Sequence, residues 1–261
     1  MTRSTHIEVL SIVSFNNQAR VAYLERSFRA FHRYNPNVRH VVIDGSTEIG
    51  YQEKIYRELG IEVRHRPTPF SERLKFGLTQ LKEDYFVFLP DDFNWIFDYP
   101  LKDAIEECRR VKIDELKLTC RGMPWFAQPC PQPQSWFEGS KVISGEQLIR
   151  QGDLFVSGRS LLRAFHEQFS LACNLIRTDF ISRLAIKMPD DIPSPGAVEK
   201  WVYPRLYLRL NRYSVAYYKM WIPAFHFINL EVEGQAQAHK ALDMLIDDNF
   251  QLYNKLYNAV H

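Results

Sequence analysis

The chain has 261 residues, of which 46% are hydrophobic and 25% charged, and its formal net charge is +2 at pH 7. These values are ordinary for a globular protein that buries a large core, and the small net charge gives no reason to expect nucleic acid as a partner. The cysteines show no metal-ligand spacing, so a zinc site is not expected and the thiols should be free in a reducing compartment; they are Cys108, Cys120, Cys130 and Cys173.

The N-terminal residues have the pattern of a first strand and not of a signal peptide. No run of apolar residues reaches the roughly 18 that a membrane-spanning helix needs. We therefore expect a cytoplasmic protein.

The first half of the chain alternates between strand and helix patterns. Strands are predicted at 7–13, 38–43, 61–64 and 85–89. Helices are predicted between them: one whose apolar residues from Val21 to Phe31 fall at helical spacing, one at Tyr51–Leu59 stopped by Gly60, and one capped by Ser71 with Leu74, Gly77, Leu78 and Leu81 facing inward. This order predicts an α/β fold with a mostly parallel sheet and helices on both faces.

The second half is less regular. Its first part is predicted to form a helix at Tyr99–Val111, a strand at Leu116–Cys120 and a proline-rich loop at Met123–Phe137. A strand within Phe169–Ile176 should then run into a helix ending at Ile186, followed by an acidic loop at Pro189–Pro195, a helix capped by Ser194, one or two strands within Arg212–Ile228, and an amphipathic helix at Ala236–Val260. We expect a single domain with three parts, 1–98, 99–234 and 235–261.

Two adjacent carboxylates, Asp91 and Asp92, follow the strand predicted at 85–89 and Pro90. Ligands of open α/β sheets bind outside the carboxyl ends of the strands, and paired acids there are well placed to hold a divalent cation against a phosphate. The alternative is a solvated turn, since Asp favours turns for local hydrogen-bonding reasons.

Polar residues also follow the first two predicted strands, as Ser14-Phe15-Asn16 and Asp44-Gly45-Ser46. In a parallel sheet these strand ends lie side by side, and their donors and acceptors suit a nucleotide. Arg66 and Arg73, which precede or begin the third helix, can meet a phosphate or pair with the acids. The sequence has no G-x-G-x-x-G and no Walker A loop, so the dinucleotide and P-loop interpretations lack their main support.

The order strand–SFN–helix–strand–VIDGS–helix–strand–SERLKFGL–helix–strand–LPDD resembles the N-terminal half of the family 2-type glycosyltransferases, which have the GT-A fold. The resemblance covers residues 7 to about 98 and departs at Pro90, where many relatives have Asp. It implies an inverting, metal-dependent enzyme that uses Mn²⁺ or Mg²⁺ and a nucleotide-diphosphate sugar, most simply a UDP-sugar. Asp92 would ligate the metal, and the donor would contact Ser14, Asn16, Asp44, Ser46, Arg66, Arg73 and Asp91.

The same resemblance implies a catalytic base roughly one hundred residues after the acid pair, near the start of a helix. Glu199, in the segment PGAVEKW, ranks first and Asp191 second; the alternative for Glu199 is simple compensation of the helix dipole. His226 resembles the late histidine that completes the metal shell in many such enzymes, and its alternative is a hydrogen-bonded core residue.

Two other classes remain open from the sequence. A sugar nucleotidyltransferase shares the sheet layout, but the segment Ser14–Arg20 lacks the glycine-rich loop that it needs. A catalytically silent protein of the same fold could bind a glycan or a nucleotide. The expected acceptor is a glycan, a polysaccharide or a lipid-linked molecule. The helix predicted at Ala236–Val260 is expected to pack on the body or on a second subunit; the inner face of a membrane is less favoured, because acids outnumber bases on its polar side.

Overall fold

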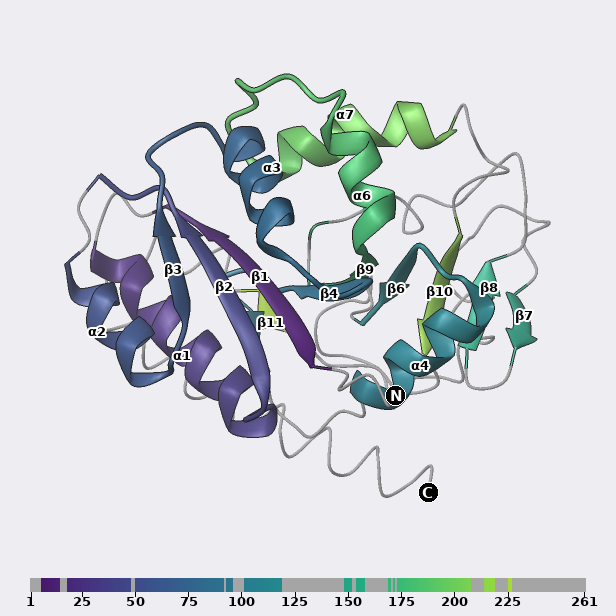
Figure 1. Cartoon of the computed structure of the whole chain (residues 1–261), viewed down its shortest axis with the longest axis horizontal. Helices are drawn as coiled ribbons and strands as arrows, with labels where there is room; N and C mark the ends of the chain where they lie inside the picture. Colours follow the sequence, from purple (N-terminus) through teal and green to yellow (C-terminus); the bar gives the residue numbers. More distant parts are fainter. Residues whose placement is uncertain are drawn as a thin grey trace.

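A computed structural model of the chain describes residues 6–14, 18–47, 50–91, 93–95, 101–118, 148–151, 154–157, 169, 171, 173–207, 214–218 and 225–226 (Figure 1). The helices are α1 (Gln18–Tyr34), α2 (Tyr51–Glu58), α3 (Phe70–Gln80), α4 (Leu101–Val111), α6 (Thr178–Ala185) and α7 (Pro195–Tyr207). The strands are β1 (Ile7–Val13), β2 (Val38–Asp44), β3 (Glu62–His65), β4 (Tyr85–Phe88), β5 (Phe93–Asn94), β6 (Glu115–Lys117), β7 (Leu148–Gln151), β8 (Leu154–Ser157), β9 (Asn174–Arg177), β10 (Val215–Tyr218) and β11 (Phe225–His226).

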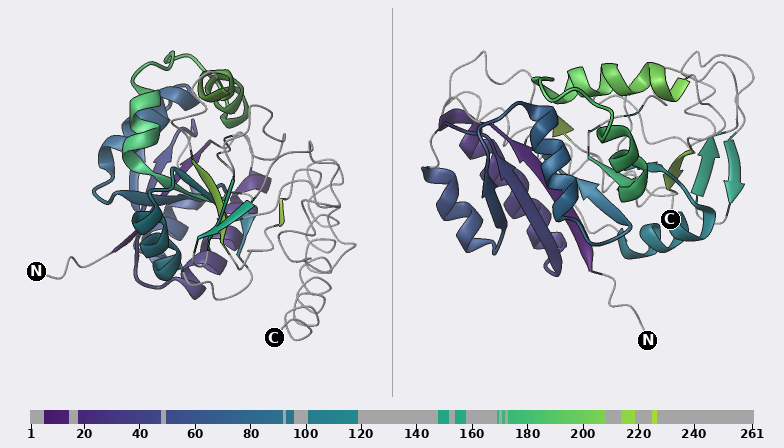
Figure 2. Two further views of the ribbon diagram at one scale, coloured as in Figure 1. Left: turned by 90° about the vertical axis from the view of Figure 1, so that its right-hand side faces the viewer. Right: turned by 45° about the horizontal axis from the view of Figure 1, so that its top comes forward.

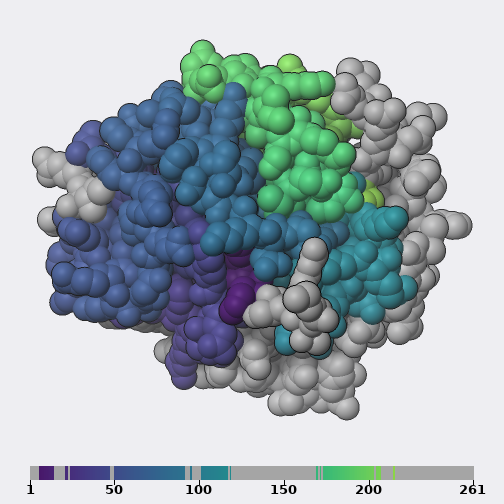
Figure 3. All heavy atoms as spheres, viewed as in Figure 1, coloured from purple at the N-terminus to yellow at the C-terminus, as the bar shows by residue number. Residues whose placement is uncertain are grey.

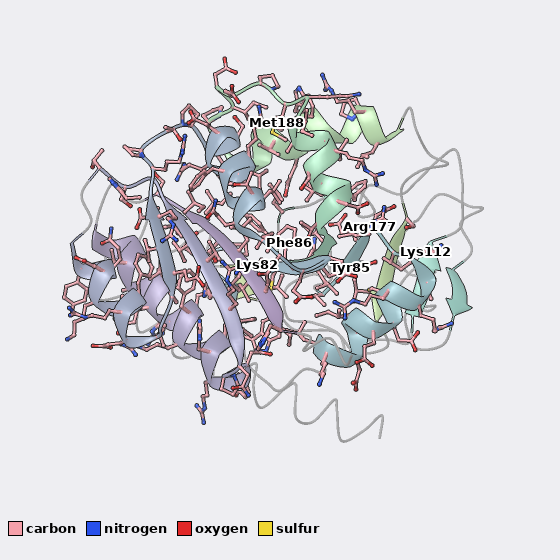
Figure 4. The ribbon with its side chains drawn as sticks, viewed as in Figure 1. Lys82, Tyr85, Phe86, Lys112, Arg177 and Met188 are labelled. Atoms are coloured by element: carbon pink, nitrogen blue, oxygen red, sulfur yellow. The ribbon has the colours of Figure 1, made fainter. Side chains whose placement is uncertain are left out.

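The main sheet is mixed and has the strand order β3-β2-β1-β4-β9-β6-β10-β8-β7. Its first four strands are the ones predicted for the first half of the chain, and they run parallel to one another. Strand β9 is antiparallel to both of its neighbours, β4 and β6. Figure 4 labels Tyr85 and Arg177, which face each other across the β4–β9 pair. The parallel half of the sheet is therefore joined directly to a mixed half.

Helices cover both faces of this sheet, because its central strands bury side chains on both sides. Along β1, Val9 and Val13 point to a core that includes residues of α1, α2 and α4. Leu10 and Ile12 point to the other core, which includes residues of α3, α6 and α7. Figures 1 and 2 show α3, α6 and α7 on the opposite side of the parallel strands from α1 and α2. The predicted α/β architecture with two helical layers is confirmed.

The predicted elements of the first half agree with the structure to within a few residues, with one error at α3. That helix begins at Phe70 and its N-cap residue is Pro69, so Ser71 is not the cap. Its hydroxyl instead accepts a hydrogen bond from the Ile192 N–H at 3.0 Å. The predicted cap of α7 is confirmed, since the Ser194 hydroxyl accepts from the Ala197 N–H at 3.3 Å.

Several predictions fall outside the described residues, including the loop Met123–Phe137 and the amphipathic helix Ala236–Val260. Of the thiols, Cys108 and Cys173 are described and are free and buried. Among the helices that the structure describes, none is long and apolar enough to cross a membrane.

A small second sheet pairs β5 with β11 in antiparallel fashion. Its register sets Phe225 opposite Asn94 and His226 opposite Phe93. The backbone of residue 226 is thereby placed beside the residue that follows Asp92 in sequence. Two segments more than a hundred residues apart in the chain meet at this point.

His40 is a buried titratable ring between β2 and α1. It is 2% exposed and lies 4.6 Å from the Phe28 ring and 5.3 Å from the stacked His32 ring, measured between centroids. Burial, with a smaller contribution from His32, holds the pKa of His40 well below its ordinary value of 6.5. Burial also lowers the pKa of His32.

We expect the free energy of unfolding to fall as the pH drops below about 6.5. In that range the unfolded chain binds protons that the folded chain does not, so His40 alone removes up to about 1.4 kcal/mol of stability per pH unit until its folded-state pKa is reached. Urea unfolding followed by circular dichroism between pH 7.5 and 5.5 measures this slope. The variant His40→Gln should have a shallower slope, and equal slopes for the two proteins would contradict the assignment.

Candidate functional site

The carboxyl ends of β1 and β2 are joined by a short set of backbone contacts. Val13 is paired with Asp44 at the end of the parallel ladder. The Gly45 N–H then donates to the Val13 carbonyl at 2.9 Å, and the Ser14 hydroxyl donates to the Gly45 carbonyl at 3.4 Å. The predicted convergence of Ser14 with the segment Asp44-Gly45-Ser46 is therefore present in the structure.

Asp44 is fully buried, with 0% exposure, and both of its carboxylate oxygens accept hydrogen bonds from the protein. Oδ1 accepts from the Ser46 N–H at 2.8 Å, and Oδ2 accepts from the Tyr56 hydroxyl at 2.9 Å. A carboxylate oxygen can accept more than one hydrogen bond, so each keeps capacity for a further donor. In this structure the carboxylate holds the turn after β2 in place.

Tyr56, which the sequence reading missed, binds Asp44 through its hydroxyl and is also influenced by the charge of Asp91. Burial is the main reason that the pKa of its hydroxyl is raised, and the nearby charges of Asp44 and Asp91 raise it further. Asp91 is therefore close enough to act electrostatically on the same phenol that binds Asp44. The ends of β2 and β4 meet in one neighbourhood, although β1 lies between them.

Arg73 extends from α3 to this edge and is 5% exposed. Its Nη1 donates to the Val13 carbonyl, and its guanidinium lies directly over Gly45, where a Cβ atom would be 2.3 Å from Nη1. Burial lowers the pKa of Arg73, and the nearby Asp44 opposes this shift. The side chain is thus a buried positive charge between two strand ends, beside a buried carboxylate.

Arg66 has a different environment from Arg73. Its backbone N–H donates to the Asp44 carbonyl at 2.6 Å, which attaches the chain after β3 to the end of β2. Its guanidinium donates to Glu72 at 2.8 Å and lies 4.4 Å above the centre of the Phe76 ring. Beside it, His65 donates from Nε2 to the Ser46 carbonyl at 2.6 Å. The positive charge of Arg66 is therefore already paired with Glu72 of α3.

The structure describes only part of the predicted metal site. Asp91 is described and partly buried, whereas Asp92 and Asn16 lie outside the described residues. For His226 the backbone is placed, opposite Phe93, but its side chain is outside the description. Among the described residues no cluster of three or more acids, histidines or cysteines could hold a metal ion.

Asp191, one of the two acceptor-side candidates, lies on a segment that is bound to α3 by hydrogen bonds. Ser71 and Ile192 form two hydrogen bonds with each other. The Ser71 N–H donates to the Ile192 carbonyl at 3.1 Å, and the Ile192 N–H donates to the Ser71 hydroxyl at 3.0 Å. Lys75 donates to the Asp190 carboxylate at 2.5 Å and to the Met188 carbonyl. Figure 4 labels Met188 beside α3, and in Figure 3 the green atoms of this region lie against the blue atoms of α3. We call the contacts of residues 188–192 with α3 the α3 clasp.

Of the two predicted bases, Asp191 is exposed within the α3 clasp. Glu199 is partly buried on α7, and its Oε1 accepts a hydrogen bond from the Leu171 N–H at 2.6 Å. Glu199 is therefore held in one orientation by the backbone of a different segment. A fixed carboxylate of this kind is compatible with a base and also with a purely structural contact.

The sequence reading found the strand-end residues but missed the side chains that support them. Tyr56 has the helical spacing of a core residue, and nothing in the sequence indicates that its hydroxyl reaches Asp44. His65 ends a strand that is mostly exposed, and Ser71 has the appearance of a helix cap. In each case the partner is distant in sequence or depends on how a side chain crosses between elements.

The chain matches no protein-family model and none of the curated proteins with which it was compared. Solved structures do match. One is Staphylococcus aureus TarS 1–349, with 14% identity, a TM-score of 0.55 and coverage of 95% of this chain and 72% of that one. Another, TarS 1–349 in complex with UDP, has 17% identity and a TM-score of 0.53 over 82% of this chain and 60% of that one. The longer TarS structure has 15% identity and a TM-score of 0.53, and the match covers 94% of this chain but only 44% of that one.

TarS is a glycosyltransferase with the GT-A fold. At these levels of identity the likeness establishes the fold. The chain therefore has a GT-A-like glycosyltransferase fold, as the order of its strand-end motifs predicted.

We expect Gly45→Ala to destabilise the protein by about 1–3 kcal/mol, the usual cost of overpacking a dense site. The new methyl group would displace the buried Arg73 guanidinium and break its bond to Val13. The measurement is the free energy of unfolding in urea. Gly196→Ala is the control, because a Cβ atom there meets nothing within 4 Å. A loss no larger than that of the control would contradict this description of Arg73.

Proposed function

We propose that this protein is a glycosyltransferase that moves a sugar from a nucleotide-diphosphate donor to a hydroxyl group of an acceptor. The observation that supports this most directly is the meeting of Asp44, Arg73 and Asp91 at one edge of the parallel strands of a GT-A-like fold. Ligands of open α/β sheets bind at this edge. The UDP present in one TarS structure makes a UDP-sugar the first donor to test.

The donor would be held by the residues at the ends of β1, β2 and β4. Ser14, Asn16, Asp44 and Ser46 would contact the nucleoside, with Asp91 nearer the ribose. Arg73 would contribute a fixed positive charge from within the site, because its guanidinium is already oriented by Val13 and Gly45. Arg66 would have to leave Glu72, or share it, in order to reach a phosphate.

A divalent cation would be held beside the acid pair by Asp92 and His226. Asp92 and His226 offer a carboxylate and an imidazole, which suit Mn²⁺, and carboxylates suit Mg²⁺. The β5–β11 register brings the backbone of residue 226 next to Phe93, one residue beyond Asp92. When bound, the cation would add positive charge beside the departing diphosphate.

The acceptor would be activated by a carboxylate of the second half, with inversion at the anomeric carbon. Glu199 is the first candidate and Asp191 the second. A base deprotonates the acceptor hydroxyl as its oxygen attacks, and the nucleoside diphosphate leaves from the opposite side. The fixed orientation of Glu199 by the Leu171 N–H supports this ranking. A glycan, a polysaccharide or a lipid-linked molecule remains the proposed acceptor class, with a cytoplasmic setting.

The first prediction from this function concerns binding. In isothermal titration, UDP should bind in the presence of Mn²⁺ and much more weakly without it. Asp92→Ala should abolish the increase in UDP affinity that Mn²⁺ causes. The fold should stay intact, because a carboxylate after a strand end adds little packing. Asp103→Ala, at an exposed position of α4, is the control. Absence of UDP binding in the unmodified protein, with and without metal, would overturn the proposed function.

The second prediction concerns the base. Glu199→Gln should lower kcat by at least about a hundredfold, the low end of what a general base contributes, while UDP affinity stays unchanged. The fold should survive because the glutamine side-chain oxygen can still accept from Leu171. Initial rates with a panel of nucleotide sugars and acceptors measure this. If Glu199→Gln stays active and Asp191→Asn does not, the base lies in the α3 clasp.

A further inference from the structure

Two buried serines hold the backbone immediately before the acid pair. The Ser11 hydroxyl, on β1, donates to the Leu89 carbonyl at 2.5 Å. The Ser27 hydroxyl, on α1, donates to the Pro90 carbonyl at 3.3 Å. Both serines are 0% exposed. These are the last two carbonyl groups before Asp91, and each is held by a side chain from a different element.

Ser11 is also the end of a hydrogen-bond chain that runs through the two histidines. Its hydroxyl lies 2.9 Å from His40 Nε2, and His40 Nδ1 lies 3.0 Å from His32 Nε2. A carbonyl oxygen can only accept, so the Ser11 hydroxyl hydrogen points to Leu89 and its oxygen accepts from His40. A neutral His40 therefore has its hydrogen on Nε2, and its Nδ1 accepts from the Nε2–H of His32. The Leu89 carbonyl fixes the direction of every bond in the chain.

Helix α1 also contacts the segment that follows the acid pair. Phe31 meets Trp95, which comes directly after β5, in an edge-on arrangement with 4.8 Å between ring centroids. Trp95 is 2% exposed. On the same helix face, Phe28 packs on the His40 ring at 4.6 Å. Residues of α1 and β1 therefore hold the chain both before and after Asp91 and Asp92.

We propose that Ser11, Ser27, His32 and His40 form a positioning network that sets where the acid pair is presented. The network touches neither nucleotide nor cation. This proposal rests on the proposed function in one respect, the identity of the ligand that Asp91 and Asp92 bind. Loss of a donor would leave a buried carbonyl unsatisfied, and the strand end would shift to recover a partner. Residues that orient metal ligands from behind typically change metal affinity by 10- to 100-fold.

The test compares two deletions of equivalent hydrogen bonds at opposite ends of β4. Ser11→Ala removes the bond to Leu89, after the strand. Thr178→Val removes a hydroxyl that donates to the Glu83 carbonyl at 2.8 Å, before the strand. Both should lower the unfolding midpoint. Only Ser11→Ala should weaken Mn²⁺-dependent UDP binding, by about tenfold or more. His40→Gln, which can still donate to Ser11, should retain more affinity than His40→Leu.

Two further measurements test the network without any ligand or enzymatic activity. Hydrogen exchange of the peptide covering residues 89–95 should speed up in Ser11→Ala and not in Thr178→Val. Nitrogen-15 NMR of the imidazoles at neutral pH should show His40 and His32 with the hydrogen on Nε2. If the unmodified protein binds no UDP, the proposed function fails and these two measurements still decide on the network. Unchanged exchange in Ser11→Ala, or a His40 ring with its hydrogen on Nδ1, would overturn the network.

Discussion

The parallel pairing of β1 with β2 on one side and β4 on the other determines where the candidate residues at the ends of these strands lie. The register sets Val13 beside Asp44 and Leu10 beside Phe88, so the turns that follow these strands emerge at one edge of the sheet. Because β1 is buried on both faces, a slip of its register would move its apolar side chains to the wrong core. The hydrophobic cores thus fix the register, and the register fixes the site.

This edge contains charges that are expensive to bury. Asp44 and Arg73 are both nearly inaccessible to water, and an isolated buried charge costs several kcal/mol. The protein offsets this cost with the Ser46 N–H and the Tyr56 hydroxyl at Asp44 and with the Val13 carbonyl at Arg73. The negative charge of Asp44 also favours the charged form of Arg73 and so opposes the lowering of its pKa by burial. A polar ligand arriving here would meet groups that are already oriented, so little reorganisation would oppose binding.

The sequence was sufficient for the parallel half of the fold because each strand there is a short apolar run between turn residues, and each helix has a regular apolar spacing. The predicted strands therefore agree closely with β1 to β4. The candidate site was predictable to the extent that its residues lie at a strand end or just after one, as Asp44 and Asp91 do. Tyr56 and Ser71 could not be assigned, because their hydroxyl partners lie across an element boundary or more than a hundred residues away. Local pattern determines which face a side chain occupies but not which atom it meets.

Helix α3 contacts both halves of the chain, because it reaches the end of β1 through Arg73 and residues 188–192 through the α3 clasp. Helix α3 places Arg73 against the ends of β1 and β2. Two other residues of the same helix, Ser71 and Lys75, form hydrogen bonds with residues 188–192. Helix α7 begins only a few residues later, with Glu199 bonded to Leu171. A displacement of α3 would therefore shift the donor side and the proposed acceptor side together. In the proposed transfer, which requires in-line attack across the two sides, a shared helix would keep the reacting groups aligned, since small misplacements are costly.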